Sequence, residues 1–349
     1  GYDMSGSFSS NAMASKAKAM YGKRLKETDY QELLRRRSVN EIAAYLKNET
    51  GYKDILTGIN EHSIHRGHLE MLIRQRFFLI FLQLIRYGDT AKSSFYKYGI
   101  YLIEIKQILV TIRAFNDKDR STQIAQMPIF AGKYTSFDLE KLVVATDYDQ
   151  LLDVLKNTVY YEALKPHRPK SNDDFDYTVC EVALKAVYYQ QVNAIIEKEF
   201  SGDTKRQMKE IFNTQIELDN VTKIYRWKKY YKASPEEIEK VLNPTFERIP
   251  KKKLIEWIET CDAETFLQRV SESAYKNYID DKNFVFIEYH TDAIQYNLNK
   301  HIIRFSSNPD LILVAFLGLL EIEIQNIIDI IEGVRYNVEI DKISKLLIY

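Results

Sequence analysis

The sequence predicts an all-α protein with three similar helical subdomains. Only 12 glycines and 7 prolines occur in 349 residues, so long helical segments have few interruptions. Apolar residues recur at helical spacing, as in EIEIQNIIDIIEGVRY (321–336), while the Val/Thr-rich alternation typical of strands is scarce. With 45% hydrophobic and 28% charged residues, the chain can bury a core and is not disordered.

A pattern of short helices occurs three times, at 30–56, 138–164 and 254–279. In each copy a short helix ends at a polar turn, a second helix with two apolar anchors follows, and a tyrosine comes next. The turns are Arg37-Ser38, Thr146-Asp147 and Cys261-Asp262; the anchors are Ile42 and Leu46, Leu151 and Leu155, Phe266 and Val270; the tyrosines are Tyr52, Tyr160 and Tyr275.

A second pattern, in long helices, places a glutamate three residues before an amide. It reads EIKQI, ELDNV and EIQNI, and its copies begin 113 and 106 residues apart. At about 100° per residue, Glu323 falls on the apolar face of its helix, between Phe316 and Ile330. The six polar positions are Glu104, Gln107, Glu217, Asn220, Glu323 and Asn326.

Both repeated patterns together predict three copies of one helical unit, at 13–128, 129–240 and 241–349. Three copies either close around a pseudo-threefold axis or form an open stack. In a closed ring, the glutamates and amides could line a central cavity. The favoured alternative is that each glutamate is buried and satisfied by neighbouring amides and backbone groups. An acid–base pair is least favoured, because no nucleophile or glycine-rich loop accompanies the glutamates.

Three further motifs have a functional and a structural interpretation. HSIHRGH (62–68) could present two histidines to a metal, but a solvent-exposed surface is favoured because no cysteine lies nearby. AGKYTS (131–136) lacks the first glycine of a phosphate loop, since position 127 is methionine, so we expect no nucleotide binding there. YRWKKYYK (225–232) could bind nucleic acid, but a helix end with inward aromatics and outward cations is favoured. We therefore expect no metal and no cofactor.

Charge, cysteines and apolar runs restrict where the protein acts. The 49 basic and 49 acidic residues create no overall field that would attract nucleic acid or an acidic membrane. Cys180 and Cys261 lie far apart, which favours a reducing cytosolic compartment. No signal peptide is expected in 1–20. The apolar runs at 77–82 and 311–317 are shorter than the roughly 20 residues needed to cross a bilayer, so we expect core helices.

The ordered set of segments resembles the C subunit of bacterial V-type (A/V-type) ATPases, a family that includes the d subunit of eukaryotic vacuolar ATPases. The similarity lies in AMYGKRLKETDYQELL (19–34), SVNEIAAYLKNET (38–50), SPEEIEKVL (234–242) and LLEIEIQNIIDIIEGVRYNV (319–338), and extends over essentially the whole chain. The resemblance implies an all-helical funnel of three subdomains without catalytic activity. It also implies that the funnel rests on the cytoplasmic face of the membrane rotor ring and receives the end of the central shaft.

The expected function is therefore that of a non-catalytic central-stalk subunit, a socket that couples the rotor shaft to the membrane rotor ring. Its partners would be the central shaft subunits and the rotor ring subunits, without nucleic acid or direct nucleotide binding. The six polar positions would then contact the shaft or stabilise the subdomains. The alternative is a helical-repeat module that binds RNA or peptide through 225–232, and an enzyme comes third. Peripheral attachment would depend on protein contacts, because the chain has no net positive charge.

Overall fold

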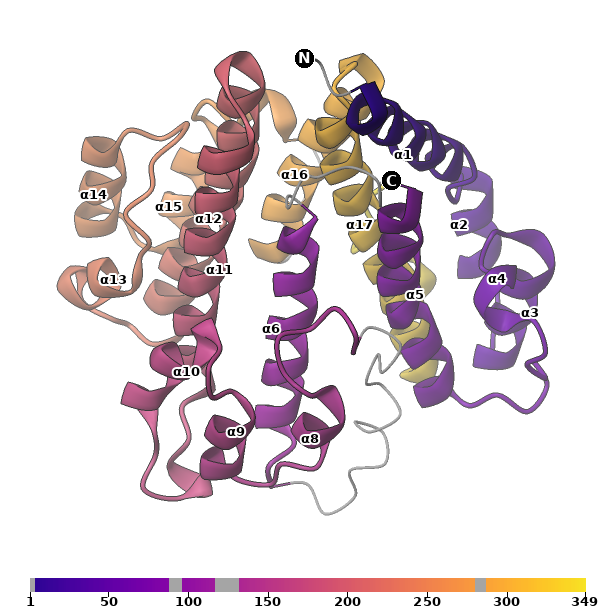
Figure 1. Cartoon of the computed structure of the whole chain (residues 1–349), viewed down its shortest axis with the longest axis horizontal. Helices are drawn as coiled ribbons and strands as arrows, with labels where there is room; N and C mark the ends of the chain where they lie inside the picture. The colour runs from indigo at the N-terminus through magenta and orange to yellow at the C-terminus, as the bar shows by residue number, and fades with distance from the viewer. Residues whose placement is uncertain (1–3, 88–95, 117–131, 280–286) are drawn as a thin grey trace. The chain divides into compact units, whose positions relative to one another are not determined.

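The computed structural model describes residues 4–87, 96–116, 132–279 and 287–349 (Figure 1). Helices, turns and loops account for all of these residues, and no β-strand occurs among them. The predicted all-α class is therefore confirmed.

Long helices alternate with groups of short ones along the chain. The α-helices are α1 (Met4–Gly22), α2 (Glu27–Leu34), α3 (Val39–Glu49), α4 (Lys53–Leu56), α5 (Arg66–Tyr87), α6 (Lys97–Arg113), α8 (Leu139–Val143), α9 (Tyr148–Val154), α10 (Val159–Leu164), α11 (Tyr177–Glu199), α12 (Gly202–Tyr230), α13 (Pro235–Val241), α14 (Lys251–Thr260), α15 (Ala263–Ser271), α16 (Ile287–Phe305), α17 (Pro309–Arg335) and α18 (Ile340–Ser344). Short 3-10 turns occupy Lys165–His167, Asn172–Asp174 and Lys276–Tyr278.

The turns that were predicted to start the second short helix are N-caps. Ser38, Asp147 and Asp262 each accept a hydrogen bond from the backbone N–H three residues later, at the start of α3, α9 and α15. Such a cap satisfies one of the backbone donors that a helix start leaves unpaired, and stabilises the helix by about 1 kcal/mol. The polar turns therefore fix where each of these helices begins.

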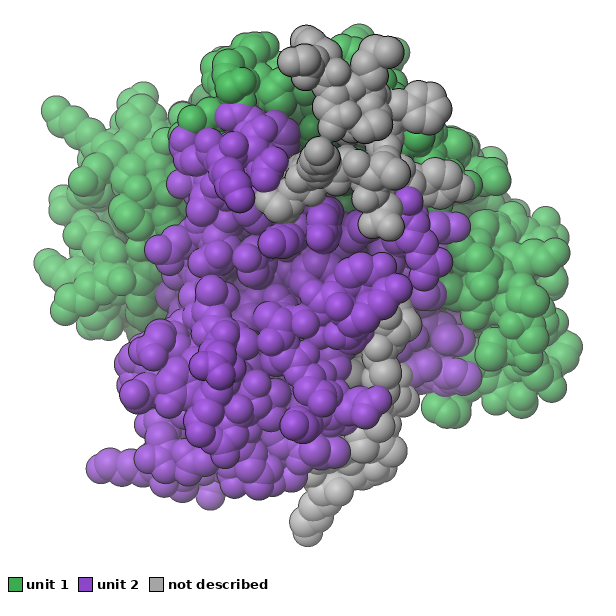
Figure 2. All heavy atoms as spheres, viewed as in Figure 1, with its two compact units in different colours: residues 1–66, 201–349 green, residues 67–200 purple. Residues whose placement is uncertain are grey.

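The chain divides into two compact units, coloured separately in Figure 2. Unit 2 comprises residues 67–200, in which α6 packs against α11, α8 packs against α6, α10 packs against α11, and α9 packs against α8. α5 approaches the first turn of α6 at Gly99, where an added Cβ would lie 2.2 Å from the Phe81 ring. Only glycine therefore allows this close packing.

Unit 1 combines both ends of the chain, residues 1–66 and 201–349. In its C-terminal part α12 packs against α15 and α16, and α16 against α17. The N-terminal helices α1 and α3 also pack against α17, and α2 packs against α18. The first helices of the chain thus pack against its last ones. The repeat spans 13–128, 129–240 and 241–349 stay a prediction, and the 128/129 boundary lies outside the described residues.

The most apolar helix, α17, is long and apolar enough to cross a membrane by length and composition. In the structure, however, 78% of its most apolar window is buried. Leu313, Ala315 and Ile330 are almost fully covered by protein. This burial agrees with the expectation of a core helix.

The packing of α16 against α17 predicts a pH-dependent stability. Burial, together with the smaller effects of the charges of Glu321 and Asp329, raises the pKa of Asp292 from 3.8 to about 7. A carboxyl whose pKa is higher in the folded state binds more protons there than in the unfolded chain, so the free energy of unfolding should fall as pH rises from about 4 to about 7. The upper limit of this change is roughly 4 kcal/mol.

The measurement is urea denaturation across this pH range, with Asp292→Asn as the comparison. Asp292→Asn should flatten the pH dependence, because asparagine does not titrate. An unchanged slope in Asp292→Asn would contradict this assignment.

Candidate functional site

The six predicted polar positions lie on three long helices and are all buried. Glu104 and Gln107 lie on α6, Glu217 and Asn220 on α12, and Glu323 and Asn326 on α17, with exposed fractions between 0% and 9%. A buried carboxylate is costly unless donors surround it, so the partners of each glutamate decide its role.

Glu217 accepts hydrogen bonds from the loop before α14 and from Tyr275, which follows α15. The Tyr275 hydroxyl donates to Oε1 over 2.6 Å, and the backbone N–H of Arg248 donates to the same oxygen over 3.0 Å. The Glu247 N–H donates to Oε2 over 2.7 Å, and the Ile249 nitrogen lies 3.3 Å from both oxygens. The loop before α14 thus wraps its N–H groups around this carboxylate.

Glu104 is bound in the same manner within unit 2. Tyr160 donates its hydroxyl proton to Oε1 over 3.0 Å. Ser136 donates both its backbone N–H, over 2.7 Å, and its hydroxyl, over 2.5 Å, to Oε2. Ser136 belongs to the AGKYTS segment, so this residue serves the buried carboxylate.

Glu323 makes the third contact of this type, and it joins the two ends of the chain. The Tyr52 hydroxyl donates to Oε2 and the Leu25 backbone N–H donates to Oε1, each over 2.7 Å. In the other two contacts 56 and 58 residues separate glutamate and tyrosine, whereas here the separation is 271. Glu104 and Glu217 therefore each bind the tyrosine of the short-helix pattern that follows in sequence, and Glu323 binds the tyrosine of the first such pattern.

Among the described residues, the three tyrosines are the largest side chains that are fully buried. A hydroxyl two positions before each tyrosine accepts the tyrosine backbone N–H, and donates to a carbonyl three or four residues before itself. The repeated patterns described above do not include these residues, although the pattern Thr/Ser-x-Tyr is present in all three copies. They are Thr50, Thr158 and Ser273.

The amides Asn220 and Asn326 each bind both backbone groups of one residue. Asn220 donates to the Asn243 carbonyl over 2.9 Å and accepts from its N–H over 3.0 Å. Asn326 makes the same pair with Ile348, over 2.7 Å and 3.1 Å. Gln107 is buried at the matching position of α6. Each asparagine thus fixes a chain segment beside the neighbouring glutamate.

Asn326 also ties the C-terminus to the N-terminal helices. Its Nδ2 donates to the Tyr30 hydroxyl over 3.2 Å, and the Tyr30 ring stacks on Tyr349 with centroids 4.4 Å apart. The last residues of the chain therefore pack directly on α2.

The pKa shifts around the buried carboxylates agree with a structural role for them. Burial raises the pKa of Glu104, although the hydrogen bonds from Ser136 and Tyr160 favour its charged form. Burial and the facing glutamates hold the pKa of Tyr160 and Tyr275 well above the usual range, so both phenols stay protonated and donate. Each glutamate is thus an acceptor surrounded by fixed donors, and in this arrangement it is not exposed to a reacting group.

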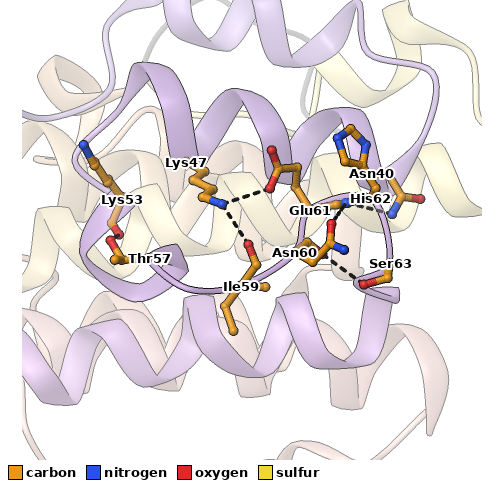
Figure 3. A network of polar contacts seen from close by, with 9 residues as sticks. All are labelled: Asn40, Lys47, Lys53, Thr57, Ile59, Asn60, Glu61, His62 and Ser63. Carbon is orange, nitrogen blue, oxygen red and sulfur yellow. Dashed lines mark hydrogen bonds and ion pairs between the residues drawn. The ribbon is translucent and has the colours of Figure 1, made fainter.

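The histidine motif does not lie on a single helix. His62 and His65 precede α5, and only His68 belongs to it. α3 holds the preceding turn in place: Lys47 contacts the Ile59 carbonyl and Glu61, and Asn40 donates to the Glu61 carbonyl (Figure 3). The part of the chain that the structure describes contains no group of three or more metal-ligating side chains.

The cations of YRWKKYYK are largely paired within the protein. Lys228 donates to the carbonyls of Ile258 and Cys261, which caps the end of α14. Lys229 forms an ion pair with Glu264. Arg226 is likewise paired, with Glu288. These three cations thus have structural roles at the end of α12, whereas Tyr230 and Tyr231 are exposed, so the expectation of inward aromatics does not hold for these two residues.

Replacing the buried glutamates should destabilise the fold. Glu217→Ala and Glu323→Ala leave the tyrosine hydroxyl and backbone N–H groups buried without an acceptor, so each should lower the free energy of unfolding by about 2–4 kcal/mol. Urea denaturation measures this loss, with the exposed Glu259→Ala on α14 as control. Wild-type stability in both variants would argue against a structural role.

The contact between the chain ends predicts that removing C-terminal residues will loosen the N-terminal helices. Deleting residues 347–349 removes the partners of Asn326 and Tyr30, so α2 and α3 should open more readily. Hydrogen exchange followed by mass spectrometry should show faster exchange in 27–49. The matching helices at 148–164 and 263–271 serve as internal controls. Equal acceleration everywhere would instead indicate global destabilisation.

Comparison with known proteins identifies the family of this chain. The family described as ATP synthase (C/AC39) subunit matches residues 13–346. The A-type ATP synthase C subunit of Methanosphaera stadtmanae is 23% identical over 323 residues, which cover 89% of this chain and 80% of that protein.

Two further relatives match over shorter segments. The A-type ATP synthase C subunit of Methanosarcina mazei is 23% identical over 239 residues, covering 64% of this chain and 60% of that protein. The protein of the same name from Methanosarcina acetivorans is 24% identical over 230 residues, covering 61% and 57%. Because the family match extends over nearly the whole chain, this protein belongs to the ATP synthase (C/AC39) subunit family.

Proposed function

We propose that this protein is a non-catalytic central-stalk subunit of a rotary A/V-type ATPase, and that it couples the rotor shaft to the membrane rotor ring. The family match over residues 13–346 carries this proposal. The curated relatives are named as C subunits of A-type ATP synthases, and this family provides a structural stalk subunit rather than a catalytic one.

A coupling subunit must transmit torque without deforming, and the buried contacts support such rigidity. Each glutamate joins a long helix to a group of short helices through donors that lie within 3.3 Å. Hydrogen bonds to a charged group are stronger than neutral ones, and burial protects them from competing water. Helices joined in this way would move together under load.

The proposed partners are the central shaft subunits and the rotor ring subunits, at the cytoplasmic face of the membrane. In this proposal Glu104, Glu217 and Glu323 stabilise the subunit from inside, because their side chains are buried. Other surface residues would contact the shaft. Direct binding of nucleotide or nucleic acid is not part of the proposed mechanism.

Reconstitution tests this function. The purified chain should form a stable complex with purified shaft subunits in size-exclusion chromatography, and should join ring-containing vesicles. Glu217→Ala should lose binding only in proportion to its unfolded fraction, because the glutamate lies inside. A folded Glu217→Ala that no longer binds would show instead that this glutamate contacts the shaft. A wild-type chain that binds neither component would refute the proposal.

A further inference from the structure

An open groove of about 630 Å³ lies within unit 1, beside the turn that joins α2 to α3. It is lined by three consecutive arginines, 35–37, and by the face of α3 that carries Tyr45 and Asn48. Ile42 and Leu46 are buried on the opposite face of α3, and this helix packs against α17. The groove therefore lies on the outward side of α3.

The three arginines are not needed to build the group of short helices. In the second and third copies of the short-helix pattern, the corresponding residues before the N-cap are 144–146 (VAT) and 259–261 (ETC). None of these residues is basic, yet α9 and α15 begin at the same kind of N-cap as α3. Three adjacent positive charges also repel one another. A contact outside the chain therefore explains the arginines better than the fold does.

Two of the arginines are held in place by the protein itself. The guanidinium groups of Arg35 and Arg36 form ion pairs with Glu32, over 3.3 Å and 3.2 Å. The guanidinium of Arg36 also lies over the Tyr45 ring, 5.0 Å from its centroid. These contacts restrict the rotamers of Arg36, so this side of the groove is ordered before any partner binds.

Arg37 and Asn48 provide donors that a partner can reach. The backbone N–H of Arg37 donates to Oε2 of Glu41 over 2.8 Å. The Arg37 guanidinium and the Asn48 amide are exposed, and neither makes a hydrogen bond or ion pair with the residues that the structure describes. A guanidinium presents its N–H donors in a planar fork that matches a carboxylate, and the amide adds two further donors. The groove thus offers accessible donors to an acidic group.

Two carboxylates in the same groove restrict the kind of anion that fits. Glu41 and Glu49 also line it, so the continuous negative charge of a nucleic-acid backbone would lie against both of them. Binding to an anionic lipid surface typically takes about four to eight clustered basic residues, and Glu32 already pairs with two of the three arginines. A single aspartate or glutamate side chain can contact the arginines without approaching the two carboxylates.

The remaining lining suits a polypeptide. Ala44 and the ring of Tyr45 supply neutral and apolar surface between the charged groups. A groove of this size is within the range that accepts a short peptide segment. A segment that carries a carboxylate among neutral residues therefore matches the groove in charge and in size.

We propose that the groove on the outward side of α3 binds an acidic segment of a partner protein, whose aspartate or glutamate side chain accepts hydrogen bonds from Arg37 and Asn48. Arg36, held by Glu32 and Tyr45, adds positive charge beside this carboxylate. The identification of the partner as another subunit of the ATPase complex rests on the proposed function.

Titration of the isolated chain tests the groove independently of the proposed function. A fluorescein-labelled, capped pentapeptide of alternating alanine and glutamate should bind at low salt in fluorescence anisotropy, whereas the same peptide with glutamine in place of glutamate should not. Arg37→Ala should weaken this binding by about tenfold. It should leave the melting temperature unchanged, because the Arg37 guanidinium has no partner among the described residues.

Arg269→Ala is the matched control, because it removes an exposed arginine from α15, in the third copy of the pattern, and should bind the peptide as the wild type does. Wild-type affinity in Arg37→Ala would overturn the proposal. Binding of a single-stranded oligonucleotide in preference to the peptide, if Arg37→Ala abolishes it, would overturn the proposal as well, because the groove would then recognise phosphate.

A photo-crosslinker at position 48 identifies the partner in the assembled membrane complex. p-Benzoylphenylalanine in place of Asn48 should form a crosslink to another subunit, close in sequence to an aspartate or glutamate, as determined by mass spectrometry. The same group in place of Glu272 is the matched control, because Glu272 is exposed two residues after the anchor Val270, as Asn48 is after Leu46. It should not reach that segment.

Crosslinks from position 48 that remain only within this chain would contradict the proposal. If the chain does not join the complex at all, the proposed function fails, and the peptide titration alone decides about the groove.

Discussion

The described fold depends on the hydrogen bonds between a buried glutamate and a buried tyrosine. A carboxylate in a protein interior is tolerated only where donors replace the water it has lost. Here the donors are a tyrosine hydroxyl and backbone N–H groups at the start of a helix group, so both must be in place before the glutamate can be buried. The interaction thus specifies how the long helices pack against the short ones. Apolar contacts alone would allow more than one such packing, because they are not directional.

The same interaction determines where the ends of the chain lie. Glu323, close to the C-terminus, has its donors at Leu25 and Tyr52, so the N-terminal helices complete the environment of the last long helix. The stacking of Tyr30 on Tyr349 reinforces this contact. A single compact unit therefore contains both ends of the sequence, and the intervening residues 67–200 form the other unit.

A stalk subunit that catalyses no reaction depends on the stiffness of its fold and on its surfaces. The motifs that suggested chemistry serve structure instead: Ser136 binds Glu104, and Lys228 caps a helix.

The sequence alone determined the helical class, the repeated pattern of glutamate and amide, and the turns that cap the short helices. These features are local: helical periodicity and N-cap chemistry depend on residues within a few positions of one another. The resemblance to a known family could likewise be recognised from the sequence segments and their order along the chain. The burial of Glu323 could be predicted because helical geometry places it among apolar neighbours.

Only the tertiary structure decided which donors each glutamate would receive. Tyr52 and Glu323 are 271 residues apart, and no local rule links them. The Thr/Ser-x-Tyr pattern is present in all three copies of the sequence. Only the tertiary structure shows that each of these tyrosines donates its hydroxyl proton to a buried glutamate.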